Sequence, residues 1–122
     1  MLAAMILPAA DIPRPVPDTV FRTPDGGSID LSKYRGKVVA LEFLLTTCPH
    51  CQKCSQMLQK LHQEYGPKGF QVVGIATNSM SHMLVGDYKK NFGLTYPVGF
   101  TEHQTAVQWL QHPMMLRYAY QC

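Results

Sequence analysis

Residues 38–51 read VVALEFLLTTCPHC and divide into two unlike halves. The first half is a nearly continuous apolar run, which is typical of a strand buried on both faces of a sheet. The second half ends in a Cys-x-x-Cys pair, after which helical periodicity begins. Two thiols therefore stand where a buried strand gives way to the first turn of a helix, and this position makes redox chemistry the leading hypothesis.

The length and net charge of the chain limit the number of domains and the kinds of partner to expect. Its 122 residues suffice for one domain with a modest core. The formal net charge is only +3, and the 11 lysines and arginines are scattered along the chain. We therefore expect no nucleic acid and no anionic lipid among its partners.

The N-terminal region differs in composition from the rest. Residues 1–10 are apolar but too short to span a bilayer, and they lack the basic start of a signal peptide. Residues 11–18 contain Pro13, Pro15 and Pro17, which favour an extended arm. We predict an arm over residues 1–18 and a domain over residues 19–122, with no membrane span. The compartment stays open, and bacterial cytoplasm or periplasm both fit.

The element pattern predicts an α/β fold built around one β-α-β unit. A strand over 38–45, a helix over 49–65 and a strand over 70–76 follow one another with short joints, so the two strands should be parallel. Asp25-Gly26 marks a hairpin turn ahead of this unit. We also expect a helical turn over 31–34, capped by Asp30, and a helix over 81–92. An extended piece over 96–100 should follow, and Pro97 limits it to an edge strand or to the start of a strand. A last helix should begin near Thr101.

Apolar spacing predicts which helix faces are buried. Both main helices show apolar residues three or four positions apart, as an amphipathic helix requires. The expected buried residues are Cys51, Cys54, Leu58, Leu61 and Tyr65 in the first helix and Met80, Leu84, Tyr88 and Phe92 in the second.

The cysteine pair has the surroundings that thiol chemistry requires. Only a thiolate attacks a disulfide, and the unpaired N–H groups at a helix start stabilise one. We expect Cys48 to sit there as the attacking thiol, with Pro49 at the first helical position and His50 adding positive charge when protonated. Cys51, one turn further in, should resolve the mixed disulfide.

Two further cysteines need an interpretation. Cys54 could extend the pair to a metal site with His50 and His62, but it lies roughly 240° around the helix from Cys48. We therefore interpret Cys54 as a small buried apolar residue, and expect neither a metal nor a cofactor. Cys122 is the last residue and carries no role in this interpretation.

Residues 43–51, FLLTTCPHC, following residues 31–39, LSKYRGKVV, resemble the TlpA-like branch of the redoxin (AhpC/TSA) superfamily of the thioredoxin fold. The resemblance covers about residues 21–109. It implies a thiol–disulfide oxidoreductase in which Cys48 is the nucleophile, Cys51 the resolving thiol and Glu42 the buried strand acid that accepts the Cys51 proton. It also implies disulfide-containing proteins or small molecules as substrates, and a cysteine pair that needs no cofactor. The Pro49-His50 dipeptide is similar to that of the oxidising DsbA family.

The chain departs from the family pattern in two places. Thr47 stands where a tryptophan is common, which should alter partner recognition. The family also continues into a cis-proline loop and a C-terminal β-β-α segment; Pro113 comes too early to be that proline. We therefore expect a domain truncated before that loop, whose incomplete sheet edge invites a homodimer or a strand swap.

Alternatives remain at this point. Glu42 could face solvent from an edge strand. A peroxiredoxin-type peroxidase is a second enzyme hypothesis, although Leu45 and Leu41 occupy places where that motif needs Thr and Pro. A non-catalytic metal-binding module using Cys48, His50 and Cys51 is the alternative from a different class.

Overall fold

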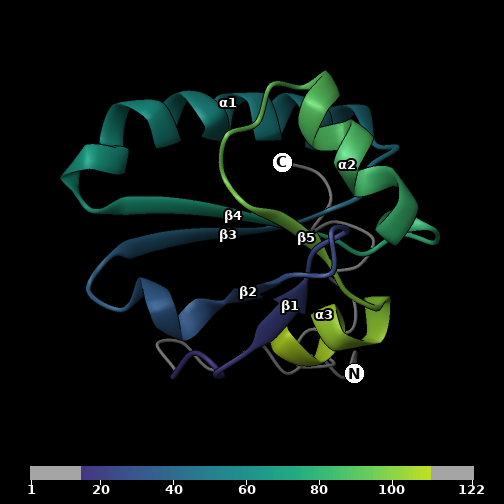
Figure 1. Cartoon of the computed structure of the whole chain (residues 1–122), viewed down its shortest axis with the longest axis horizontal. Coiled ribbons are helices and arrows are strands. Elements are labelled where there is room, and N and C mark those ends of the chain that lie inside the picture. The colour runs from purple at the N-terminus through teal and green to yellow at the C-terminus, as the bar shows by residue number, and fades with distance from the viewer. Residues whose placement is uncertain (1–14, 111–122) are drawn as a thin grey trace, which may run out of the picture.

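The structure, a computed structural model, describes residues 15–110 and has the expected α/β architecture. Figure 1 shows one sheet with α1 and α2 on one face and α3 on the other. The sheet order is β2-β1-β5-β4-β3. The strands are β1 (Val20–Arg22), β2 (Ser28–Asp30), β3 (Val38–Leu44), β4 (Phe70–Ala76) and β5 (Val98–Phe100). The helices are η1 (Leu31–Tyr34), α1 (Pro49–Tyr65), η2 (Gly66–Lys68), α2 (Ser81–Asn91) and α3 (His103–Leu110).

The predicted β-α-β unit is confirmed. Strands β3 and β4 are parallel, paired from Val38 opposite Phe70 to Leu44 opposite Ala76, and α1 connects them. Strand β5 is parallel to β4 and begins directly after Pro97, as a strand start should. Because parallel strands end at the same edge of a sheet, the loops after β3, β4 and β5 meet there.

The short N-terminal elements also follow the sequence. Strands β1 and β2 form an antiparallel hairpin around Asp25-Gly26, where Gly26 takes a φ of 84° that suits glycine. Asp30 caps η1, since its carboxylate accepts hydrogen bonds from the Ser32 backbone N–H at 3.0 Å and hydroxyl at 2.6 Å. Strand β1 then pairs antiparallel with β5, which ties the hairpin to the main sheet.

Two apolar cores lie on opposite faces of the sheet. Leu44, Val72 and Val85 belong to the core beneath α1 and α2, whereas Phe43 and Ile75 belong to the core beneath α3. Side chains alternate along a strand, so the even-numbered positions of β3 face α1. Glu42 therefore points into the same layer as Leu44.

One expectation about β3 is wrong. The strand is buried on both faces only in its second half, and Val38 is 69% exposed. Within residues 15–110, β3 pairs with β4 alone and lies at the edge of the sheet. An apolar run predicts a strand, but the number of neighbouring strands depends on pairings far away in the sequence.

The predicted buried helix faces are partly wrong. The buried residues of α1 are Cys51, Ser55 and Gln59, whereas Tyr65 is exposed. In α2 they are Ser81, Val85 and Tyr88, and Met80 and Leu84 are exposed. In α1 the polar residues Ser55 and Gln59 occupy the inner face, because hydrogen bonds to Glu42 and Thr95 satisfy them.

Some predictions fall outside the described residues. Most of the proposed arm over 1–18, Pro113 and Cys122 are among them, and the division at residue 18 stays a prediction.

Candidate active site

Cys48 is the N-cap residue of α1. Its backbone is extended, with φ −93° and ψ 119°, and Pro49 follows at the start of the helix. A turn in which the Cys48 N–H donates to the Leu45 carbonyl at 3.2 Å leads the chain from β3 into the helix. The Cys48 side chain is half-buried, so its sulfur is held at the helix start and remains reachable from solvent.

The pKa of the Cys48 thiol is lowered, mainly because the backbone N–H of Cys51 donates a hydrogen bond to its sulfur. Partial burial acts in the opposite direction, and the Cys51 side chain and the His50 backbone N–H add smaller lowering effects. The His50 side chain itself is exposed. Its backbone therefore contributes to this pKa, and the effect expected from the imidazole stays a prediction.

Cys51 lies beneath Cys48 and has no exposed surface. It belongs to the apolar core below α1 and α2, and Cys48 packs against the edge of that core. Among residues 15–110 no disulfide joins these cysteines, and Cys54 is half-buried rather than in the core. One accessible thiol of lowered pKa thus contacts a second, inaccessible thiol.

Glu42 is buried, with 8% of its surface exposed, so the solvent-facing alternative is wrong. Its two carboxylate oxygens lie 3.2 and 3.0 Å from the Ser55 hydroxyl on α1. That hydroxyl is also 2.8 Å from the Tyr88 hydroxyl on α2. Sequence reasoning placed Glu42 in the interior by resemblance, but it missed Ser55 altogether.

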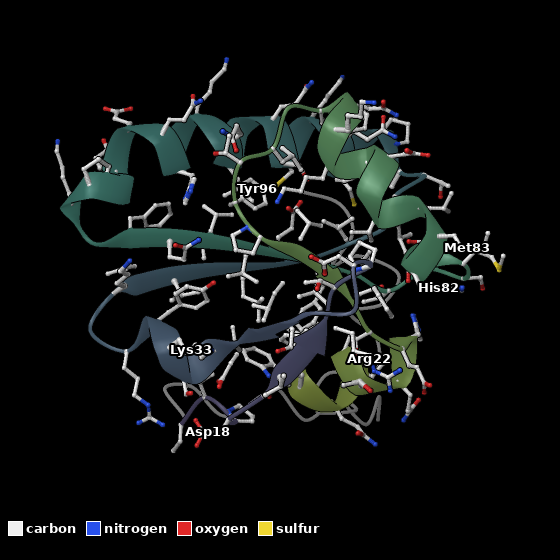
Figure 2. All side chains as sticks on the ribbon, viewed as in Figure 1. Asp18, Arg22, Lys33, His82, Met83 and Tyr96 are labelled. Carbon is white, nitrogen blue, oxygen red and sulfur yellow. The ribbon has the colours of Figure 1, made fainter. Side chains whose placement is uncertain are left out.

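More polar side chains continue this layer beneath α1. Figure 2 shows Tyr96 between α1 and the sheet, where its hydroxyl donates to the Ser55 carbonyl at 3.3 Å. Burial first, and then the nearby negative charge of Glu42, raise the pKa of Tyr96. One turn further along the helix, the Gln59 amide exchanges two 2.8 Å hydrogen bonds with Thr95. The 4-residue spacing of Cys51, Ser55 and Gln59 is the sequence signal that could have identified this face.

The loop before Cys48 is tied to the loop after β4. The Asn78 side chain accepts a hydrogen bond from the Thr46 N–H at 3.1 Å and donates to the Thr46 hydroxyl at 2.8 Å. The Gln52 amide donates to the Thr46 carbonyl at 3.2 Å. These contacts hold the strand-to-helix turn from both sides and so fix where Cys48 is presented.

A groove of about 840 Å³ opens at the same edge of the sheet. It lies between the starts of α2 and α3, and its lining includes Asn78, Met80, His82 and Phe100. Met80 has a positive φ of 62° and is 55% exposed. Figure 2 shows His82 and Met83 projecting outward from the first turn of α2.

A family comparison identifies the group of proteins concerned. The model of the Redoxin family matches residues 13–111. The chain belongs to the Redoxin family. The resemblance based on residues 31–51 is therefore confirmed at the family level.

Two curated relatives of this redoxin carry different names. The chain is 35% identical over 80 residues to probable glutathione peroxidase 8-B of Xenopus laevis, and this alignment covers 60% of this chain and 38% of the relative. It is 31% identical over 74 residues to the thiol-disulfide oxidoreductase ResA of Halalkalibacterium halodurans, and this alignment covers 61% of this chain and 42% of the relative. The alignments thus span about two fifths of these relatives' length.

Solved structures confirm the thioredoxin-like fold of this redoxin. A thiol:disulfide interchange protein of the thioredoxin family from Chlorobium tepidum superposes with a TM-score of 0.70 at 28% identity. The match covers 83% of this chain and 68% of that protein. The ResA relative is named as a thiol–disulfide oxidoreductase, and the Chlorobium neighbour as a thiol:disulfide interchange protein.

Two further findings concern metals and membranes. Nowhere in residues 15–110 do three His, Cys, Asp or Glu side chains gather in a way that could hold a metal ion. No helix in the same region is long and apolar enough to cross a bilayer.

Proposed function

We propose that this redoxin is a thiol–disulfide oxidoreductase that works through Cys48 and Cys51. The observation that carries the proposal is the pairing of one accessible thiol of lowered pKa with one fully buried thiol at the start of α1. Attack on a disulfide needs a thiolate that a partner can reach, and release of that partner needs a second thiol within reach. The two cysteines differ in the way these two tasks require.

The first step is attack by Cys48. Its thiolate adds to one sulfur of a substrate disulfide, a bond forms between the two sulfurs, and the other substrate sulfur leaves as a thiolate. The N–H groups at the start of α1 stabilise the Cys48 thiolate before attack. The product is a mixed disulfide between Cys48 and the substrate.

The second step is resolution by Cys51. Its thiol loses a proton to the Glu42 carboxylate through a bridging water, because the carboxylate lies about one helical turn away, and the resulting thiolate attacks the Cys48 sulfur. A Cys48–Cys51 disulfide forms, and the substrate leaves as its second thiolate, so the substrate is reduced by two electrons. The same steps in reverse oxidise a dithiol substrate. The cysteine pair itself carries the electrons.

Substrates are proposed to be disulfides of proteins or small molecules. The groove beside the loop after β4 lies at the edge of the sheet where Cys48 is presented, and the exposed Met80, just before α2, lines it. Such a surface suits an extended peptide segment next to a disulfide. Pro49 and His50 stand between the two thiols, and we infer that they set the reduction potential of the pair.

Reduction of insulin disulfides, with dithiothreitol as the electron source, tests the proposal. We expect activity in the parent protein and at least a 100-fold loss in Cys48→Ser. Cys51→Ser should instead trap the substrate as a mixed disulfide on Cys48, which mass spectrometry detects.

Cys54→Ser is the matched control, because it removes a thiol from the same helix and keeps the pair. We expect it to retain the parent's activity. Full activity in Cys48→Ser, or equal losses in all three variants, would overturn the assignment of the pair.

A thiol peroxidase is the second candidate, and similarity to the Xenopus glutathione peroxidase favours it. In this reaction the Cys48 thiolate attacks a peroxide oxygen, which gives a Cys48 sulfenic acid and releases an alcohol or water. Cys51 then condenses with the sulfenic acid to form the disulfide and release water. Hydrogen peroxide consumption with a thiol reductant, measured beside insulin reduction, separates the two functions. The oxidoreductase proposal requires the insulin reaction to be the faster one.

A further inference from the structure

A buried chain of hydroxyl groups ends on the carboxylate that serves the proposed resolving step. Ser55 stands between Glu42 on β3 and Tyr88 on α2, and its own side chain has no exposed surface. It bridges three elements: the strand that leads to Cys48, the helix that carries both thiols, and the helix packed beside it. A serine in a helix interior contributes little to helix stability, so its place here calls for a reason in its contacts.

Counting protons shows which group donates to which in this chain of hydroxyl groups. A serine hydroxyl has one proton to donate, and an ionised carboxylate has none. When Glu42 is ionised, Ser55 donates to it and Tyr88 donates to Ser55. When Glu42 takes up a proton, it donates to Ser55, and Ser55 turns toward the Tyr88 oxygen. In both states Ser55 keeps its hydrogen bonds to Glu42 and Tyr88, so Glu42 can change its charge while this contact is retained.

Helix geometry places Ser55, the middle group of this chain of hydroxyl groups, on the same face of α1 as Cys51. Ser55 follows Cys51 by four residues, so the two side chains lie on the same face of α1, one turn apart. Both are fully buried. Ser55 therefore ties the Glu42 carboxylate to the face of α1 that carries the resolving thiol, at a residue about one helical turn, roughly 5 Å of rise, from Cys51.

Other titratable groups face the same carboxylate. Tyr96, ahead of β5, interacts electrostatically with Glu42, with Tyr88 and with the Cys54 thiol. Burial keeps Tyr96 in its neutral form, so it acts there as a hydrogen-bond donor to the Ser55 carbonyl. Ser55 is the member of this group that contacts the carboxylate through a hydroxyl and cannot itself become charged.

We propose that Ser55 is a positioning residue, which holds Glu42 ionised beneath Cys51 and thereby sets the pH range in which Cys51 resolves the mixed disulfide. The inference rests on the proposed function, because it assigns Glu42 the role of proton acceptor. Tyr88 supports Ser55 by donating to it when the carboxylate is charged.

The test is the pH dependence of insulin reduction in Ser55→Ala. Loss of the hydroxyl removes a hydrogen bond to the charged form of Glu42, and such bonds favour ionisation. We expect the acidic limb of the rate profile to move to higher pH by about one unit. At pH values below the limb the rate of insulin reduction should fall roughly tenfold, and at pH values above it the rate should equal that of the parent. Tyr88→Phe should move the limb in the same direction by less.

Controls separate this role from simple damage to the fold. Thr95→Val removes the hydroxyl that accepts a hydrogen bond from Gln59 beneath the same helix, one turn further from the thiols, and should leave the limb in place. Alkylation of Cys48 by iodoacetamide should be unchanged in Ser55→Ala, because the helix-start N–H groups remain. Adding Ser55→Ala to Glu42→Gln should cause no further shift.

The outcomes distinguish this inference from the proposed function. If the parent lacks disulfide reductase activity, or if Cys51→Ser remains fully active, the proposed function fails and this inference with it. If those results hold but Ser55→Ala and Tyr88→Phe both follow the parent profile, the inference alone is overturned. Should Ser55→Ala not fold, Tyr88→Phe and titration of the Glu42 carboxyl by NMR in that variant decide the matter.

Discussion

The Cys48 thiol has its pKa lowered chiefly by backbone groups, and this makes its reactivity testable apart from any substrate. The Cys51 N–H is the main cause, and the His50 N–H adds to it. We expect the rate of alkylation by iodoacetamide to reach half its maximum at a pH below the value of about 8.5 for an ordinary thiol. Cys48→Ser should lose the fast reaction, because Cys51 is buried.

The His50→Ala variant measures how much the imidazole contributes to the lowered pKa of the Cys48 thiol, because the substitution leaves the backbone N–H in place. We expect the half-maximal pH to stay below the ordinary thiol value in this variant, with at most a small upward move from loss of the imidazolium. A return to the ordinary value would instead assign the effect to the side chain. Either result measures the contribution that the sequence alone predicts for His50.

The same lowered pKa links the stability of the reduced protein to pH. A thiol whose folded pKa lies below its unfolded value binds more protons in the unfolded state, so stability rises with pH between the two values. This contribution is present above the unfolded pKa and is lost as pH falls through the folded one. Urea unfolding under reducing conditions from pH 6 to 10 should therefore show a rise in the parent that Cys48→Ser lacks.

Single residues of the site were predictable to different degrees. Cys48, Cys51 and Pro49 stand in a local motif, and four consecutive residues suffice to place them at a helix start. Ser55 and Tyr88 are 33 residues apart, and nothing local marks them as partners. Their contact depends on how α1 and α2 pack over the sheet, which a single sequence does not reveal.

At the scale of elements, the junction between β5 and β1 holds the N-terminal hairpin on the sheet. A Cβ at Gly99 would lie 2.5 Å from the Arg22 carbonyl oxygen and 3.0 Å from the Ile29 side chain. Gly99→Ala should therefore push β1 away from β5 and lower the free energy of unfolding by about 1–3 kcal/mol. Thermal unfolding followed by circular dichroism measures the change.

Gly86→Ala is the matched control for that substitution. Gly86 lies within α2, and a Cβ there would meet no atom within 4 Å. Since alanine favours a helix over glycine, we expect stability to rise by about 0.5–1 kcal/mol. Equal effects of the two substitutions would contradict the close packing of β5 against β1.

Element boundaries were predicted more reliably than helix faces. The strands at 38–44 and 70–76 and the helix at 49–65 follow from runs of apolar residues, proline and glycine. The buried face of α1 was misassigned because periodicity assumes that inward positions are apolar. Ser55 and Gln59 break that assumption, and their hydrogen-bond partners lie on other elements.

At the scale of the whole molecule, β3 forms one edge of the sheet within residues 15–110. Val38 is 69% exposed there, and a flat apolar edge strand invites pairing with another chain. Homodimer formation stays a prediction from the sequence. We expect the parent to associate reversibly as its concentration rises, and Val38→Lys to remain monomeric, because a lysine on the edge opposes strand pairing.

Light scattering after size-exclusion chromatography measures this association, and Val20→Lys is its control. Val20 is 60% exposed, but its strand, β1, lies between β2 and β5 in the sheet order and not at the edge of the sheet. The two substitutions therefore add the same charge at similarly exposed valines and differ in their access to an edge. Association that survives Val38→Lys, or that both variants abolish equally, would place the contact elsewhere on the surface.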